Sequence, residues 1–555
     1  MERSGAVPLA ALAQGLVAAL LAGGLWLATV AAGGFHFSPD SMSYAALGHG
    51  FSTGHPFVGT ILWLGARPGR LQANWPPLYP ALIAAVHAFG PSLQWSEFLL
   101  SGLTNAAAVL FGVSAVRRAC GTCPWWAIPV LAGTAWGLMV AGFGWTEPVC
   151  LALLGLHYWL AAWAMQTAAQ RRTMPLLLLC GQGLAVGLAY LDRYAAAPFL
   201  LTALLLPLAL AVGCRGRRLR PLLAGTTAAG LGVALPVVPW SLAALALTGH
   251  LGTPYLPVGA GLHTAWHHTV LTVRGALAQT VSSPGARPAV AHATEQHLLV
   301  ATGICFAVAL VVDVVRRRPQ AAAPAAFAPA LLALMLAIDA AAYTAVLVEM
   351  RAHYFFDAIG LRLLAPALYP ALLALVVGAA CVPWRWTREA LLLPVGLLIL
   401  LHGVPVARAG WHHPRIVASL SGPWCSAGPR GDCALFGWLQ QHTSDADLII
   451  GNAPFTINFQ LGRTTEEVAA YPYNPVATVA DFRRWAADWH ALHPDGRVLV
   501  ALDAATGPIG APGERYGPLM ARLWSGDGTM SLGDGLVAAP AVAGPTYRVW
   551  ALAGA

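Results

Sequence analysis

The sequence predicts a mainly α-helical, polytopic membrane protein with a C-terminal extracytoplasmic α/β domain. Hydrophobic residues make up 57% of the 555 residues, charged residues make up only 10%, and the mean hydropathy is +0.63. Soluble globular chains carry much more charge, so this composition excludes them. Arginine clusters separate the apolar segments, and the composition becomes polar after about residue 408. These two observations define the topology and the domain boundary.

Apolar segments long enough to cross a bilayer recur along the first 408 residues. The first of them is too long for the apolar part of a signal peptide and is predicted to span the membrane. About eleven spanning helices are expected, at residues 7–32, 98–116, 124–142, 148–167, 174–191, 195–213, 221–247, 297–315, 324–348, 359–382 and 389–407.

Clusters of arginine follow every second predicted helix and therefore lie on one side of the membrane. The positive-inside rule makes that side cytoplasmic, with the N-terminus inside and the C-terminal domain outside. Because the arginines form short clusters between apolar runs, they indicate topology and do not predict nucleic-acid binding. All 31 basic residues are arginine, and the clusters are Arg117-Arg118, Arg171-Arg172, Arg215 to Arg220, Arg316 to Arg318 and Arg385 to Arg388.

The predicted domains are a membrane-embedded module, residues 1–408, and an extracytoplasmic domain, residues 409–555. The module has two large outer loops, at residues 33–97 and 248–296. In the second domain, apolar β-branched runs predict strands and amphipathic runs predict helices. The expected strands are residues 447–450 and 497–502, and the expected helices are residues 436–442 and 481–493.

The first outer loop carries a lone carboxylate, Asp40, just after the first predicted helix. A carboxylate at the membrane surface can deprotonate an acceptor hydroxyl, so Asp40 is a candidate general base. Alternatively, Ser38-Pro39-Asp40 is an ordinary helix start. Further along the same loop, Pro76-Pro77 is expected to open a short apolar helix.

Three further charged positions are predicted at the outer ends of helices. Glu147 begins the fourth helix, and a carboxylate buried there needs a partner. The alternative is that Glu147 only caps the helix, with Pro148 in its first turn. Asp192-Arg193 lies in a turn with almost no loop. As an alternative to a functional role, the two residues would form a local ion pair that holds this turn. Arg362 lies in an apolar helix start and needs an anion, so with Arg193 it can clamp a phosphate; the alternative is snorkelling to the surface.

Other polar residues have less defined roles in the sequence. Asp339 lies inside an apolar helix, so a partner is expected but is not identifiable from sequence. His263 and His267 have the spacing of a helical metal pair, although an interfacial helix is favoured because no carboxylate or cysteine is adjacent. Cys120 and Cys123 form a weak Cys-x-x-Cys pattern. The sequence does not decide whether Cys425 and Cys433 form a disulfide.

Together these features resemble the polytopic GT-C glycosyltransferases, the family of protein O-mannosyltransferases and lipid A aminoarabinose transferases, and most closely a bacterial family-39-like group. The resemblance spans about residues 8–410 and rests on short motifs in family order. The motifs are Asp40-Ser41 with Tyr44, Pro76 to Pro80, Thr146-Glu147-Pro148, Asp192-Arg193-Tyr194, and Arg362 to Pro366. Asp192 replaces the small residue that is usual at its position.

The resemblance implies an inverting transfer of a sugar from a polyprenyl-phosphate donor to an acceptor hydroxyl at the outer face of the membrane. On this basis Asp40 is the base, and Arg193 and Arg362 bind the donor phosphate. Glu147, Tyr44 and Asp192 are expected to bind acceptor, sugar or metal. Metal use varies within this family, so the resemblance implies no particular cofactor and leaves a divalent cation open. The implied partners are the lipid-linked sugar, an unidentified glycan, lipid or protein acceptor, and membrane lipids.

Two other classes of function remain open at this stage. A transporter or flippase for a lipid-linked or anionic solute would also explain buried arginine and aspartate, but it predicts essential charges near the middle of the membrane. A sensor or scaffold that binds a partner through the outer domain leaves the motifs of the first loop without a role.

Overall fold

The computed structural model describes residues 9–55, 61–62, 75–171, 173–213, 219–248, 261–281, 327–353, 361–381, 433–468, 477–504, 517–533 and 535–554. Contacts within the chain divide it into two compact units. The first unit comprises residues 1–36 and 97–416, and the second comprises residues 37–96 and 417–555. The first outer loop, which we assigned to the membrane module, is thus grouped with the C-terminal residues.

The first unit is a helical bundle, and seven helices in the described part of the chain are long and apolar enough to cross a membrane. The chain is therefore a multi-pass membrane protein. The long helices are α1 (Leu9–Gly33), α4 (Leu93–Cys120), α7 (Glu147–Arg171), α9 (Phe199–Gly213, preceded by the 3₁₀ turn η1, Tyr194–Ala196), α10 (Leu219–Thr248), α13 (Phe327–His353) and α14 (Leu361–Cys381).

These seven helices confirm seven of the expected spans, and an eighth is the shorter apolar helix α8 (Leu176–Asp192). The segment 124–142 does not form one continuous helix. It forms α5 (Ala127–Ala132) and α6 (Ala135–Ala141), with Thr134 in an extended conformation between them. Glycine and threonine at 133–134 have low helix propensity, which favours a break there. The segments 297–315 and 389–407 lie outside the described residues.

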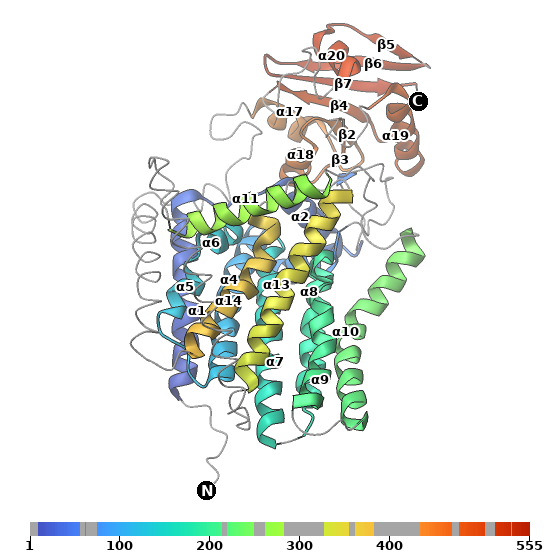
Figure 1. Ribbon diagram of the computed structural model, residues 1–555. Helices are drawn as coiled ribbons and strands as arrows, with labels where there is room; N and C mark the ends of the chain where they lie inside the picture. Colours follow the sequence, from blue (N-terminus) through green and yellow to red (C-terminus); the bar gives the residue numbers. More distant parts are fainter. Residues whose placement is uncertain are drawn as a thin grey trace. The chain divides into compact units, whose positions relative to one another are not determined.

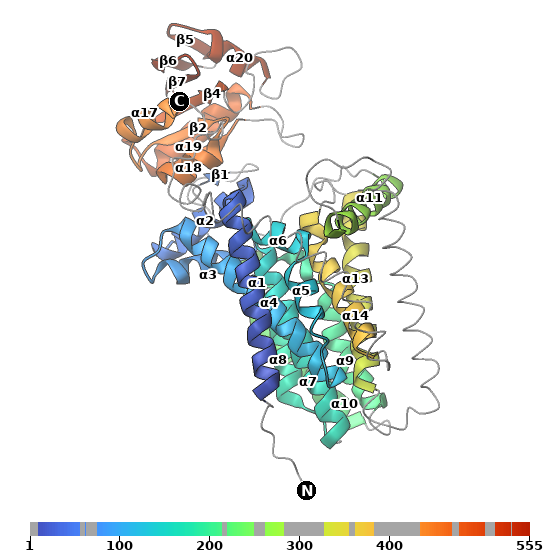
Figure 2. The same cartoon turned by 90° about the vertical axis from the view of Figure 1, so that its left-hand side faces the viewer.

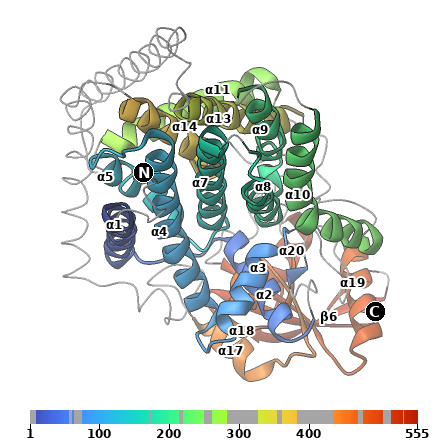
Figure 3. The ribbon, with the colours of Figure 1, turned by 90° about the horizontal axis from the view of Figure 1, so that it is seen from below.

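Helix α7 lies inside the bundle, where it packs against α8, α9, α13 and α14 (Figure 3). Helices α8 and α10 approach each other closely because glycine lies at their contact. A Cβ atom on Gly232 of α10 would lie 2.0 Å from the carbonyl oxygen of Cys180, and one on Gly183 of α8 would lie 2.2 Å from that of Ala229. Any larger residue at these positions would force the two backbones apart.

Helix α11 (Leu262–Val281) lies across the ends of α13, α14 and α6 (Figures 1 and 2). The backbone N–H of Gly261 donates to the carbonyl of Ala352 at 3.1 Å, and Ala265 is fully buried against the bundle. His263 and His267 lie on its exposed side, and Trp266 is 57% exposed. The expected helix is therefore present with one exposed side, and its place at the membrane interface stays a prediction.

The second unit contains a seven-stranded sheet of order β1-β3-β2-β4-β7-β6-β5 (Figure 1). The first four strands in that order are parallel, and β7, β6 and β5 are antiparallel to their neighbours. The strands are β1 (Ile61–Leu62), β2 (Leu448–Gly451), β3 (Thr464–Glu467), β4 (Val498–Asp503), β5 (Met530–Gly533), β6 (Leu536–Ala543) and β7 (Tyr547–Ala553).

Both faces of the sheet are covered by helices, which explains why β2 and β4 are buried at every position. One face packs against α19 (Val479–Leu492) and α20 (Gly517–Ser525), and the other packs against α17 (Ala434–His442) and α18 (Pro454–Leu461). The strands expected at 447–450 and 497–502 and the helices expected at 436–442 and 481–493 are confirmed to within about two residues. Cys433 is disulfide-bonded, and Cys425 lies outside the described residues.

The first outer loop contributes three elements to this second unit: α2 (Pro39–Ser52), α3 (Leu78–His87) and the edge strand β1. Strand β1 pairs with β3, so that Ile61 lies opposite Thr465. Helix α2 packs against α3 and α18. The expected short helix after Pro76-Pro77 is confirmed, with Pro77 as its N-cap.

Candidate functional site

The first unit brings three of the predicted site residues together around the carboxylate of Glu147. Glu147 is the first residue of α7 and is fully buried. Its Oε1 atom accepts a hydrogen bond from Nε of Arg362 at 2.9 Å and another from Nη1 of Arg193. The positive end of the α7 dipole also favours an anion here. Two guanidinium groups are therefore held by one buried oxygen atom.

Arg193 reaches this carboxylate from the end of α8, where it is the C-cap residue in an extended conformation. Its Nε atom donates a hydrogen bond to the hydroxyl of Tyr343 at 3.2 Å. Tyr343 lies on α13, is fully buried and stacks on Phe199. Contacts from two other helices thus orient Arg193, whose side chain is 11% exposed.

Arg362 reaches the same oxygen from the first turn of α14. Its guanidinium lies over the ring of Trp145, 4.5 Å from the centroid, and Trp145 in turn stacks on Phe143. A cation–π contact of this kind fixes the plane of the guanidinium while its charge is retained. The side chain is 22% exposed, so the alternative of free snorkelling into water does not describe it.

The structure corrects the interpretation of Asp192 and Arg193 as a local ion pair. Asp192 is fully buried, and neither of its carboxylate oxygens has a hydrogen-bond partner among the described residues. Arg193 instead bonds to Glu147, which is 46 residues earlier in the chain. Oε2 of Glu147 also lacks a partner in the described part of the chain. Glu147 and Asp192 therefore leave buried acceptor atoms beside the two arginines.

The expected general base, Asp40, lies in the second unit, in the first turn of α2. Ser38 is the N-cap of this helix and shares a capping box with Ser41, so the interpretation of this segment as a helix start is correct. The cap is Ser38, and Asp40, two residues later in the first turn, is partly exposed. Capping by Ser38 does not use the Asp40 carboxylate, so a chemical role for Asp40 stays a prediction.

Tyr44, on the same helix, is 4% exposed and packs edge-on against Trp75 and Tyr79, with ring centroids 4.9 and 5.2 Å away. These contacts join α2 to the Pro76-Pro77 segment that the sequence motifs singled out. Tyr44 therefore organises the first outer loop. A role for it in binding acceptor or sugar stays a prediction.

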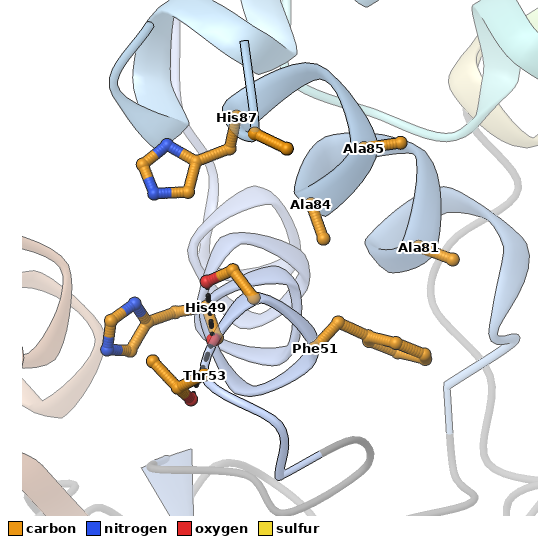
Figure 4. A pocket seen from close by; sticks show the side chains of 9 residues that line it. His49, Phe51, Thr53, Ala81, Ala84, Ala85 and His87 are labelled. Atoms are coloured by element: carbon orange, nitrogen blue, oxygen red, sulfur yellow. Dashed lines mark hydrogen bonds between the residues drawn. The ribbon is translucent and has the colours of Figure 1, made fainter. Parts of the chain in front are cut away.

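A pocket of about 640 Å³ also lies in the second unit, between the end of α2 and α3. Its lining residues include His49, Thr53, Ala81, Ala84 and His87, and the two histidine rings lie on the same side of it (Figure 4). None of the predicted site residues lines this pocket. It is therefore separate from the cluster around Glu147.

The partner of Asp339, which the sequence left open, is a pair of hydroxyl groups. Tyr158 of α7 donates to Oδ2 at 3.0 Å, and Thr202 of α9 donates to Oδ1 at 2.6 Å. Asp339 is fully buried on α13. It therefore ties three helices together inside the apolar region, where unpaired polar groups are costly.

Two residues of the arginine cluster were missed by the sequence analysis. Trp145 lies in the same Gly144 to Pro148 turn as Glu147, so the sequence could have indicated that it belongs to the site. Tyr343 is an isolated tyrosine in an apolar helix and carried no signal. Only the packing of α13 beside the end of α8 brings it to Arg193.

Comparison with solved structures defines the fold. The chain is similar to ArnT from Cupriavidus metallidurans bound to undecaprenyl phosphate, with a TM-score of 0.56, 13% identity and 97% of each chain covered. The apo state of the same protein matches with a TM-score of 0.54, 12% identity and 98% of each chain covered. The mycobacterial arabinofuranosyltransferase AftD matches with a TM-score of 0.50 and 15% identity, over 99% of this chain and 42% of AftD.

The chain thus has the GT-C fold, a polytopic membrane fold of glycosyltransferases, as the sequence motifs implied. At this level of identity the similarity defines the fold. No protein-family model matches the sequence. No curated protein matches it either.

Proposed function

We propose that this chain is an inverting glycosyltransferase that moves a sugar from a polyprenyl-phosphate donor to an acceptor hydroxyl at the outer face of the bacterial cytoplasmic membrane. The observation that carries the proposal is the pair of arginines, Arg193 and Arg362, held on the buried carboxylate of Glu147. The GT-C fold supports it, as does the similarity to an ArnT structure that contains undecaprenyl phosphate.

The two arginines suit a phosphate that gains charge as the bond to the sugar breaks. Guanidinium groups donate several hydrogen bonds in a fixed plane, which matches phosphate oxygens. Because Glu147, Tyr343 and Trp145 already hold them, they need little reorganisation when the leaving group forms. Loss of one such preorganised donor typically lowers kcat by about 10²–10³.

In this proposal Asp40 takes the proton from the acceptor hydroxyl while the hydroxyl oxygen attacks the anomeric carbon. The bond from that carbon to the phosphate oxygen breaks in the same step, so the configuration at the carbon inverts. The leaving phosphate keeps the electron pair, and the arginines stabilise its charge. Asp40 is a separate candidate residue, carried by the Asp40-Ser41 and Tyr44 motif.

Glu147 does not fit the role of a metal ligand. Its Oε1 atom already accepts hydrogen bonds from two cations, and their charge opposes the approach of a third cation. Among the described residues there is also no group of three His, Cys, Asp or Glu side chains placed to hold a metal ion. We therefore propose that Glu147 is a positioning residue for the arginines.

The test is a transfer assay in proteoliposomes that contain the purified chain. Undecaprenyl phosphate carrying one of a panel of radiolabelled sugars is supplied with a lipid and glycan extract as acceptor. We expect label to leave the lipid in the wild type and in Asp527→Asn, which changes an exposed residue between α20 and β5. Asp40→Asn should abolish transfer while the protein remains folded.

Transfer at the wild-type rate by Asp40→Asn would remove Asp40 as the base. Movement of a labelled solute across the bilayer without any covalent change would instead support a transporter. An absence of transfer from every lipid-linked sugar, together with an absence of undecaprenyl phosphate binding, would contradict the proposed function itself.

A further inference from the structure

Three cysteines lie at the ends of α4 and α14 that are remote from Arg362. Cys120 is the last residue of α4, Cys381 is the last residue of α14, and Cys123 follows α4 by three residues. The Sγ atoms of Cys120 and Cys381 are 3.9 Å apart, although the residues are 261 positions apart in sequence. All three cysteines are present as thiols.

A second contact joins the same two helices. Twelve residues earlier in each helix, the hydroxyl of Tyr369 donates to the carbonyl of Ala108 at 2.6 Å. Cys120 comes 12 residues after Ala108, and Cys381 comes 12 residues after Tyr369. The two helices are therefore parallel and stay in register between the two contacts, which places the sulfur atoms side by side reproducibly.

Glycine allows this close packing. A Cβ atom on Gly112 of α4 would lie 2.9 Å from the Tyr369 hydroxyl, and one on Gly155 of α7 would lie 2.8 Å from it. The ring of Tyr369 is thus enclosed between two helices, and α14 cannot slide along α4 without losing this contact. The spacing of the two thiols is fixed by the same packing.

The Cys-x-x-Cys spacing singled out by sequence does not define the reactive pair. Cys123 is 7% exposed, and its thiol points to the carbonyl of Pro124 at 3.7 Å. The backbone carbonyl of Cys123 is held by the amide of Gln14 at 2.8 Å. Cys120 and Cys381 are both partly exposed among the described residues.

We propose that Cys120 and Cys381 form a reversible disulfide that locks α4 to α14. One thiol of the pair attacks a small-molecule disulfide, which forms a mixed disulfide and releases one small thiol. The second thiol of the pair attacks the protein sulfur of that mixed disulfide, which forms the Cys120–Cys381 bond and releases a second small thiol. The two protein thiols are oxidised, and one molecule of the small disulfide is reduced to two thiols.

Closing the bond requires the sulfur atoms to move from 3.9 Å to about 2.05 Å apart. The adjacent Arg117-Arg118 cluster predicts that this end of the bundle faces the cytoplasm. Thiols there are kept reduced, so the disulfide would form only under oxidising conditions. The site is therefore an oxidation-sensitive one, separate from the proposed transfer reaction.

The test treats the purified full chain in nanodiscs with 4,4′-dithiodipyridine, followed by digestion without reductant and mass spectrometry. We expect a peptide pair joined through Cys120 and Cys381, which dithiothreitol separates. Thiol labelling should fall by two per chain after oxidation. Cys381→Ser should lose the cross-linked peptide pair, whereas Cys180→Ser, on α8, should keep it.

A cross-link between Cys120 and Cys123 in the wild type would overturn the proposal, as would two stable mixed disulfides at Cys120 and Cys381. Because the wild type itself is tested, a folding defect in Cys381→Ser would not obscure either result. All of these outcomes are independent of sugar transfer, so the failure of one proposal is distinguishable from the failure of the other.

Discussion

The Nε atom of Arg362 donates a hydrogen bond to Oε1 of Glu147 at 2.9 Å across 215 residues of sequence. The same oxygen accepts a hydrogen bond from Arg193. A single buried carboxylate thus sets the spacing between two cations that would otherwise repel each other.

Glu147→Gln should lower the transfer rate by tenfold or more and should also lower the stability of the protein. Breaking a buried ion pair by removing one partner typically costs about 3–5 kcal/mol, and here two guanidinium groups would lose their shared anion. Initial rates at varied donor concentration and the unfolding temperature would measure both effects. Unchanged kcat and KM in a folded variant would contradict the positioning role of Glu147.

Arg362→Ala should weaken the binding of undecaprenyl phosphate by about tenfold or more, because a hydrogen bond to a charged group contributes about 1.5–3 kcal/mol. Arg362→Lys keeps the charge but loses the planar donor set, so it should have an intermediate effect. Binding to protein in nanodiscs is the measurement, with Arg484→Lys on α19 as the exposed control. An effect confined to acceptor affinity would show that the phosphate assignment is wrong.

Gly232→Ala should destabilise the contact between α8 and α10. The added Cβ would lie 2.0 Å from the Cys180 carbonyl, and overpacking of this kind costs about 1–3 kcal/mol. Gly230→Ala, two residues earlier on α10, meets no atom within 4 Å and is the matched control. The unfolding temperatures of the two variants in the same detergent give the comparison. Equal temperatures would contradict the close approach of the two helices.

Asp339→Ala should destabilise the membrane unit more than Asp339→Asn does. The alanine variant leaves the hydroxyls of Tyr158 and Thr202 without their acceptor, and each buried unsatisfied group costs about 1–3 kcal/mol. Asparagine keeps one acceptor oxygen. Thermal unfolding with Thr344→Ala as control, on the same helix, is the measurement. If transport or transfer is lost in Asp339→Asn without any loss of stability, Asp339 has a chemical role.

The C-terminal unit should lose stability as the pH falls from about 4 to about 2. Burial alone would raise the pKa of Asp447, but hydrogen bonds from the side chain of Arg497 and from the backbone of Ser444 and Arg497 outweigh it and hold the pKa at about 2. The unfolded carboxyl has a pKa of 3.8, so its stabilising effect is complete above that value and is lost as the pH falls through about 2.

The corresponding loss is at most about 2 kcal/mol, and solvent around the 55% exposed Arg497 side chain reduces it. Chemical denaturation of the full chain, followed by tryptophan fluorescence between pH 2 and 6, would measure it. Asp447→Asn should flatten this part of the profile. A profile identical to that of the wild type would show that another group is responsible.

The sequence by itself determined the elements and their membrane character. A sufficiently long apolar segment predicts a spanning helix whatever its position in the chain. The ranges of α1, α4, α7, α9, α10, α13 and α14 could therefore be predicted from the sequence alone. Local alternation and amphipathicity likewise identified β2, β4, α17 and α19. The charged ends of helices, at Glu147, Arg193 and Arg362, were recognisable because a charge in an apolar stretch needs a partner.

Only the tertiary structure decided which partners these groups have. Arg193 bonds to Glu147 and Tyr343 and not to its sequence neighbour Asp192. The packing of α7, α8 and α13 decides this, because it sets the distances between the ends of these helices. The same is true of Asp339 with Tyr158 and Thr202, and of Cys120 with Cys381 rather than Cys123. Sequence patterns report periodicity along one element, whereas these pairs depend on the rotation and register of one helix against another, which side-chain packing sets.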